Sequence, residues 1–169
     1  MKPRERLWIT WKKRATAGAW SSPCTTLQVF GPGIKKPGDV VQSVISVIAS
    51  TNFSTTATAF VTTNASANIS PTSPANLVKF SAQGGLGAGS SNNVLATVFR
   101  GAAAITNAPV MAFASGAAFS GNGALLYIDA PGTTASTKYA VGLRTATVGS
   151  AALFPNNNTG WMSLDEIMG

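Results

Sequence analysis

The sequence lacks histidine, contains a single cysteine and has few charged side chains. Charged residues make up 10% of its 169 residues, against about 25% in an average soluble protein. Most acid–base and nucleophilic catalysis uses a group that titrates near neutral pH, and there is no histidine to supply one. Cys24 can form neither an internal disulfide nor a zinc site by itself. We therefore expect a protein that is not an enzyme and holds no metal or cofactor.

Long apolar runs are also missing. Lys12, Lys13 and Arg14 stand where the apolar segment of a signal peptide would lie, so we expect no signal peptide. The longest apolar stretch, residues 40–49, includes polar side chains and has about half the length of a membrane-spanning helix. We therefore expect no membrane partner.

The net charge of +7 is confined to the start of the chain. Residues 1–36 contain eight basic residues and one acidic residue, whereas residues 37–169 contain four of each. Clusters of proline and glycine end at Pro37, where such residues mark a turn or linker. The sequence thus predicts a basic N-terminal arm (1–36) and a neutral body (37–169). Because the body has no excess positive charge, we do not expect nucleic acid as a partner.

The composition of the body favours β-structure. Ser, Thr, Asn and Ala are abundant, and the long side chains of Glu, Lys and Arg, which helices favour, supply only five residues. Tyr139, Val141 and Leu143 alternate with small or charged residues, as in a strand with one buried face. In residues 40–49, β-branched side chains favour a strand over the helix that Asp39 could cap. Turn signals about every ten to fifteen residues predict an all-β antiparallel sandwich or barrel.

Three of the four tryptophans lie in the arm, next to a basic cluster. One hypothesis is an arm that binds nucleic acid or a membrane surface, and another is a disordered tail or a start codon assigned too early. We favour a third, an anchor that becomes ordered when it docks on a partner protein. Its candidate contact residues are Trp8, Trp11, Lys12, Lys13, Arg14 and Trp20.

Two features of the body could indicate binding sites, but a structural explanation is simpler for each. Residues 84–93 are rich in glycine, yet no Lys-Ser or Lys-Thr follows them, so we predict a flexible loop and no phosphate site. Arg100 and Glu166 could bind a sugar as a pair. We favour a structural ion pair or two solvated charges at these positions.

Several segments, taken in order, resemble a domain of tailed-phage structural proteins that occurs in tail fibres, head fibres and related virion appendages. The resemblance spans about residues 38–168, and no single motif in it is specific. Unlike the usual pattern, this chain is rich in alanine and has the segment 154–158 before its last strand. The segments are GDVVQ (38–42), STNFSTT (50–56), TAFV (58–61), ANISPTS (67–73), VFRG (98–101), LYIDAP (126–131), KYAV (138–141) and SLDEI (163–167).

This resemblance implies a jelly-roll β-sandwich of the complement and tumour-necrosis-factor type that assembles as a homotrimer. It implies a structural virion protein, made in the host cytoplasm and placed on the particle exterior: a capsid decoration, a head fibre or a short tail appendage. The arm would fasten it to another virion protein of the capsid or tail. No catalytic residue is carried over. The candidate residues for packing between subunits are Tyr139, Val141, Leu143 and Trp161.

The sequence is also compatible with two other functions. A receptor-binding module at a tail tip would contact host glycan through exposed loops, and a DNA-binding accessory protein would show steep salt dependence. The candidate loop contacts of the receptor-binding module are Gly87, Asn92, Asn93, Asn156 and Asn157.

Overall fold

The computed structural model describes residues 35–48, 53–88, 93–106, 111–113, 119–146, 149–153 and 160–169. The predicted arm lies outside the described residues, except for Lys35 and Lys36. Every helix-or-strand element in the described part is a β-strand. The strands are β1 (Val40–Ile48), β2 (Phe53–Thr55), β3 (Val61–Ile69), β4 (Leu77–Ala88), β5 (Val94–Arg100), β6 (Ala103–Ala104), β7 (Met111–Phe113), β8 (Phe119–Asp129), β9 (Thr137–Thr145), β10 (Ala151–Leu153) and β11 (Gly160–Ile167).

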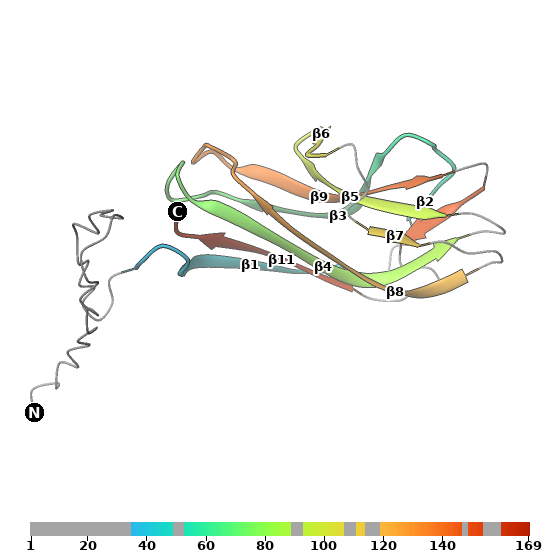
Figure 1. The fold of residues 1–169 in the computed structure, drawn as a ribbon, viewed down its shortest axis with the longest axis horizontal. Coiled ribbons are helices and arrows are strands. Elements are labelled where there is room, and N and C mark those ends of the chain that lie inside the picture. Colours follow the sequence, from blue (N-terminus) through green and yellow to red (C-terminus); the bar gives the residue numbers. More distant parts are fainter. Residues whose placement is uncertain are drawn as a thin grey trace, which may run out of the picture. The chain divides into compact units, whose positions relative to one another are not determined.

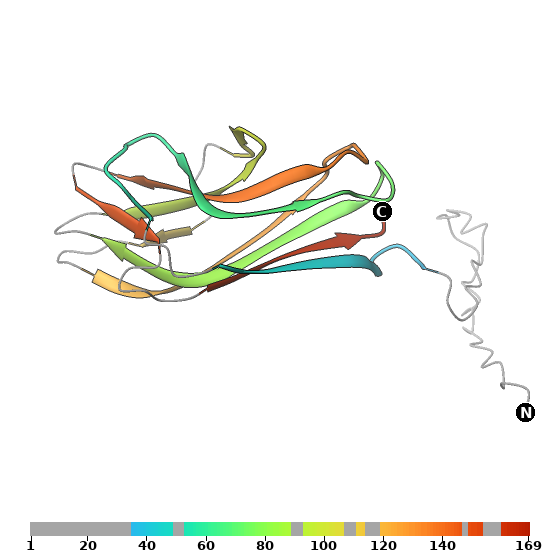
Figure 2. The same cartoon turned by 180° about the vertical axis from the view of Figure 1, so that it is seen from behind.

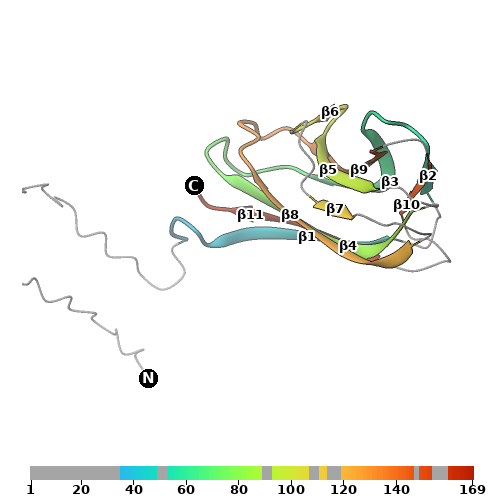
Figure 3. The same cartoon turned by 45° about the vertical axis from the view of Figure 1, so that its right-hand side comes forward.

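These strands form two antiparallel sheets that face each other as a sandwich (Figures 1 and 2). The first sheet has the order β1-β11-β4-β10-β2, and β8 also pairs with β4. The second has the order β3-β9-β5-β6, and β7 also pairs with β5. The seven strands of seven or more residues alternate between the two sheets along the chain, as in a double-sheet jelly roll (Figure 3). The predicted antiparallel β-sandwich is confirmed.

The segment that is rich in β-branched residues forms β1, as predicted. It pairs with β11 along its length, from Val40 opposite Ile167 to Ile48 opposite Gly160. The first and last strands of the body therefore lie side by side. This pairing fixes the register of β1 and so determines which of its apolar side chains face outward.

The core lies between the two sheets. Phe80 of β4, Leu164 of β11 and Tyr139 of β9 are fully buried. In β11, residues 160, 162, 164 and 166 are buried and those between them are more exposed, which is the period of two expected for a strand with one inner face. Since successive side chains of a strand point to opposite faces, each main strand contributes one set to the core and one set to an outer face.

The glycine-rich segment corrects one prediction. Residues 84–88 belong to β4 and pair with β8 on one side, whereas we predicted a flexible loop for residues 84–93. Gly84 lies opposite Gly123, and Gly87 lies opposite Ser120 of β8 and Ala152 of β10. Small residues stand on both strands, so the backbones form a regular ladder here even though glycine is a weak strand former.

Candidate functional site

The outer side of the first sheet exposes an unusual amount of apolar surface. Six large apolar side chains from three strands are between 43% and 76% exposed, and one of them, Val40, stands at the start of β1 beside a register shift. Monomeric soluble proteins rarely expose contiguous apolar patches of more than a few hundred Å², and larger ones mark interaction sites. We call this surface the apolar face, and it consists of Ile45 and Val47 of β1, Leu126 and Ile128 of β8, and Trp161 of β11.

Strand register places these residues in two groups at the margins of the sheet. Val47 lies opposite Trp161, so the β1 group forms one continuous strip with the indole. Leu126 lies opposite Ser81 and Ile128 opposite Lys79, so the β8 group forms the other margin across β4. The four strands run in the order β1-β11-β4-β8, which places polar residues of β11 and β4 between the two groups.

The polar centre of the apolar face is electrically neutral. The Nζ atom of Lys79 lies 3.3 Å from Oδ2 of Asp165, and the hydroxyl of Ser43 donates a hydrogen bond to Oδ1 of the same carboxylate. An exposed ion pair of this kind contributes little to stability. It does, however, leave no net charge that would repel a second copy of the same surface.

Glu166 lies on the opposite side of β11 from Asp165 and is completely buried. Its carboxylate accepts hydrogen bonds from the side-chain amides of Gln42 (2.7 Å) and Asn76 (2.6 Å) and from both the backbone N–H (2.7 Å) and the hydroxyl (2.8 Å) of Thr72. Burial alone would raise the pKa of this carboxyl, but the hydrogen bonds outweigh burial and lower its pKa. Glu166 is therefore a buried anion held by neutral donors.

Asp129, at the end of β8, is a second buried carboxylate with different partners. Its Oδ2 atom lies 3.0 Å from Nη1 of Arg100 and accepts a 2.6 Å hydrogen bond from the hydroxyl of Tyr139. Burial and the hydrogen bond to Asp129 raise the pKa of Tyr139. Since Arg100 and Tyr139 belong to the second sheet, this cluster ties the two sheets together at one end.

The two carboxylates flank a single residue of β4, because Val78 lies opposite Glu166 on one side and Asp129 on the other. Arg100 forms its ion pair with Asp129, which corrects the predicted partnership with Glu166. Both carboxylates are fully engaged by residues of the same chain, so this end of the sandwich has a structural role. The described residues contain no group of three or more His, Cys, Asp and Glu that could hold a metal ion.

The structure places the predicted subunit contacts in two different environments. Tyr139, Val141 and Leu143 are at most 2% exposed and form part of the core, whereas Trp161 is exposed. The first three cannot offer a surface to another chain, which corrects the prediction for them. The alternation that singled them out is correct, but it marks the inner side of β9.

The predicted loop contacts are only partly within the described residues. Gly87 is buried in β4, which corrects its placement in an exposed loop, and Asn93 is exposed. The remaining predicted contacts lie outside the described residues: Asn92, Asn156 and Asn157 of the loops, and Trp8, Trp11, Lys12, Lys13, Arg14 and Trp20 of the arm.

Sequence reasoning did not single out Ile45, Val47, Leu126 and Ile128. Their signal was present, because 40–48 and 125–128 are apolar at both odd and even positions. Such a segment supplies apolar side chains to both sides of a sheet. Only the register decides which set is exposed, and for β1 it directs Ile45 and Val47 outward.

No helix in the described part of the chain is long and apolar enough to cross a membrane. No family model matches the chain, and no curated protein matches it. Among solved structures, the chain is similar to one titled "Structure of infectious bursal disease virus Gx strain", with a TM-score of 0.43 and 11% sequence identity. The similarity covers 85% of this chain and 46% of that one. A similarity of this extent says nothing of what this chain binds or assembles with.

Proposed function

We propose that this chain is a non-enzymatic structural protein of a phage particle, whose body forms a homotrimer and whose arm docks on another virion protein. The observation that carries the proposal is the apolar face, where two groups of large apolar side chains flank a neutral ion pair. The resemblance of residues 38–168 to phage appendage domains supplies the virion role and the trimer. The expected place is the particle exterior, as a capsid decoration, a head fibre or a short tail appendage.

Self-association accounts for two features of the body together. A body with equal numbers of acidic and basic residues has little net charge to keep separate molecules apart, and apolar patches promote association. Packing of the apolar face against copies of the chain would bury Ile45, Leu126 and Trp161 and remove the exposed patch. In a symmetric assembly every subunit contributes the same surface. In a trimer, the apolar face of each subunit would contact both neighbouring subunits.

The oligomeric state tests this part of the proposal directly. We expect sedimentation equilibrium of the full chain to give three times the monomer mass at micromolar concentrations. A monomer across the accessible concentration range would overturn the proposed assembly, and a stable dimer would overturn the trimer.

The arm is proposed to attach the assembly to the particle. Trp8 and Trp11 would fill apolar recesses of the partner, and the basic side chains that follow would pair with acidic groups there. We expect the double variant Trp8→Ala/Trp11→Ala to keep the oligomeric mass and to be lost from purified particles. If this variant is incorporated as well as the unaltered chain, the tryptophans are not the anchor. Imaging of intact particles would locate the protein on the head or on the tail.

A further inference from the structure

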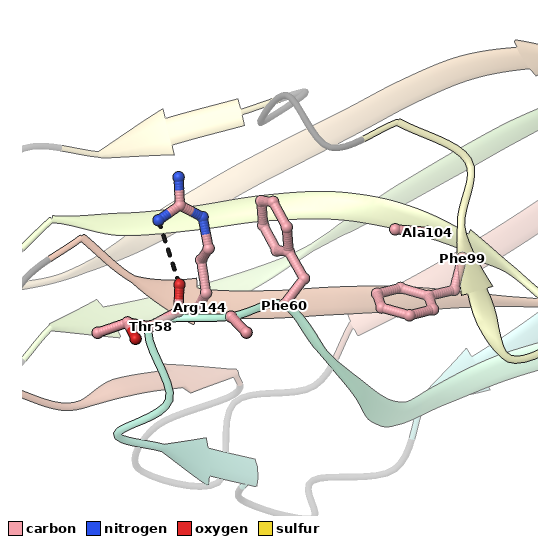
Figure 4. A pocket seen from close by; sticks show the side chains of 6 residues that line it. Thr58, Phe60, Phe99, Ala104 and Arg144 are labelled. Atoms are coloured by element: carbon pink, nitrogen blue, oxygen red, sulfur yellow. Dashed lines mark hydrogen bonds between the residues drawn. The ribbon is translucent and has the colours of Figure 1, made fainter.

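The outer side of the second sheet carries a groove that the proposed function does not use. Two adjoining hollows of about 400 and 470 Å³ share the side chains of Phe60 and Phe99. Arg144 lines the first hollow and Lys138 lines the second. Figure 4 shows Arg144 and Phe60 side by side, with Phe99 farther along the first hollow. We call this surface the aromatic groove.

The floor of the aromatic groove depends on a residue without a side chain. Phe99 is 6% exposed, and its ring lies where the Cβ atom of any other residue at position 142 would stand. Gly142 lies opposite Thr97 and Thr62 on the neighbouring strands, in the middle of the sheet. Gly142 thus lets the Phe99 ring lie close against the strand backbone.

The two cations of the groove differ from the other basic residues of the sandwich. Lys79 and Arg100 are ion-paired with aspartates, whereas Lys138 and Arg144 have no ion-pair partner among the described residues. The Cζ atom of Arg144 stands 4.9 Å from the centroid of the Phe60 ring. Its Nη1 atom makes only a long 3.4 Å hydrogen bond, to the carbonyl of Thr58. The guanidinium is therefore oriented by Phe60 but not neutralised.

Among the described residues no aspartate or glutamate lines either hollow, so each hollow carries one uncompensated positive charge. Lys138 and Arg144 are six residues apart on β9, which at about 3.3 Å per residue separates their backbones by about 20 Å. Both side chains point outward from β9, because each lies three positions from Val141, whose side chain is in the core. A ligand that meets both cations must therefore be extended and must carry more than one negative charge.

We propose that the aromatic groove binds an acidic polysaccharide, with Arg144 and Lys138 each pairing with a carboxylate or sulfate group of the polymer. The C–H faces of the sugar rings would pack over Phe60 and the exposed edge of Phe99. The hydroxyls of Thr58 and Thr62, which line the groove, are exposed and can bond to sugar hydroxyls. Because the groove and the apolar face lie on opposite outer sides of the sandwich, assembly through the apolar face leaves the groove accessible.

An acidic polysaccharide fits these observations better than a peptide or a nucleic acid. Protein partners are held mainly by large side chains in well-packed, desolvated pockets, and the shared floor of the groove is a Phe99 ring that is already buried. Nucleic-acid binding usually depends on several phosphate contacts, whereas the groove offers two cations. Two widely spaced cations suit a polymer that has a charge on only some of its units.

Binding of polygalacturonate oligomers to the full chain, measured by calorimetry, tests the proposal. The double variant Lys138→Gln/Arg144→Gln removes both groove charges, and the matched control Lys35→Gln/Lys36→Gln removes two exposed charges from the end of the arm. We expect the groove variant to weaken binding at least tenfold and the control to weaken it less than threefold. Neutral dextran of the same length should bind at least tenfold more weakly than the acidic oligomers.

Three results would overturn the proposal. The first is no binding of either polygalacturonate or dextran sulfate by the unaltered chain. The second is an equal loss in the two double variants, which would mean that net charge alone attracts the polymer. The third is a polyglutamate peptide that binds through Lys138 and Arg144 as tightly as polygalacturonate, which would make the occupant an acidic peptide. Each of these results can be obtained whether the chain is a monomer or a trimer.

Discussion

The two outer faces of the sandwich differ in what they leave exposed. The first sheet exposes the five large side chains of the apolar face and a neutral ion pair, Lys79 with Asp165. The second sheet buries the outward ring of Phe99 and leaves two cations without ion-pair partners in the described part, Lys138 and Arg144. An apolar, neutral surface suits a copy of itself, whereas a charged groove suits a ligand of opposite charge. One sandwich can therefore assemble through one side and bind through the other.

This difference has its origin in how residues alternate along two strands. In β1, both sets of side chains contain valine or isoleucine, so the outward set is as apolar as the inward one. In β9, the inward set is Tyr139, Val141 and Leu143, and the outward set combines charged residues with alanine and glycine. In both strands, alternation determines which side chains enter the core. The outward side chains determine what each face can bind.

A charge placed on the apolar face should have the largest effect. Ile45→Glu puts a carboxylate at a site that is 71% exposed in the single chain, so the fold should tolerate it. In the proposed assembly the same carboxylate would be buried without a partner. We expect the self-association constant to fall at least about 100-fold, measured by sedimentation equilibrium.

The matched control for Ile45→Glu lies on the other outer face. Asn68→Glu adds the same charge at an exposed position of β3, opposite Lys138 of β9. It should leave the oligomeric mass unchanged. Equal dissociation by the two variants would mean that added negative charge, and not the apolar face, controls assembly.

A substitution in the buried Glu166 cluster should change stability without changing either outer face. The Glu166 carboxylate accepts N–H hydrogen bonds from Gln42, Thr72 and Asn76. In Glu166→Gln the NH2 group of the new amide would point at one or more of these N–H groups. We expect the free energy of unfolding at pH 7 to fall by about 2–3 kcal/mol, measured by urea denaturation. Binding of polygalacturonate by the folded variant should not change. A loss of binding would mean that the groove depends on this end of the first sheet.

The pH dependence of the same cluster has a definite sign. The pKa of Glu166 in the folded chain is lower than the ordinary value of 4.5, so its ionised form contributes stability above pH 4.5. That contribution is lost as the pH falls through the folded-state pKa. Between pH 5 and acidic pH, the unaltered protein should therefore lose more stability than Glu166→Gln. Parallel pH profiles would contradict the lowered pKa.

The sequence predicts the fold more fully than the surfaces, for physical reasons. Alternation and β-branched residues locate β1 and β9, because core burial imposes a period of two. The glycine-rich end of β4 could not be predicted as a strand, since its stability depends on pairing with β8 and β10, which are distant in sequence. The same limitation applies to sites. Trp161 was predicted as a contact between subunits, but the apolar face around it requires the register of four strands.

The close approach of the Phe99 ring to Gly142 allows a prediction for the aromatic groove. A glycine within a strand is ordinarily unfavourable, so replacement by alanine would stabilise an unconstrained position. Here the new methyl group would overlap the ring of Phe99, and overpacking of this kind costs about 1–3 kcal/mol. We expect Gly142→Ala to lower the free energy of unfolding by about 1–2 kcal/mol and to weaken polygalacturonate binding. In a Phe99→Ala background the same change should no longer destabilise, which a double-mutant cycle measures.

The smallest expected effect tests whether Arg144 acts through its charge alone. Arg144→Lys keeps the positive charge but removes the planar group that stands over Phe60. A guanidinium over an exposed ring contributes about 0.5–1 kcal/mol, so stability should change by no more than this. If the planar group also pairs with a carboxylate through two N–H bonds, polygalacturonate binding should weaken about three- to fivefold, less than in Arg144→Gln. Unchanged binding in Arg144→Lys would reduce the role of Arg144 to a point charge, and a loss equal to that of Arg144→Gln would assign its whole contribution to the planar group. The apolar face should be unaffected in both variants, because it lies on the other outer side of the sandwich.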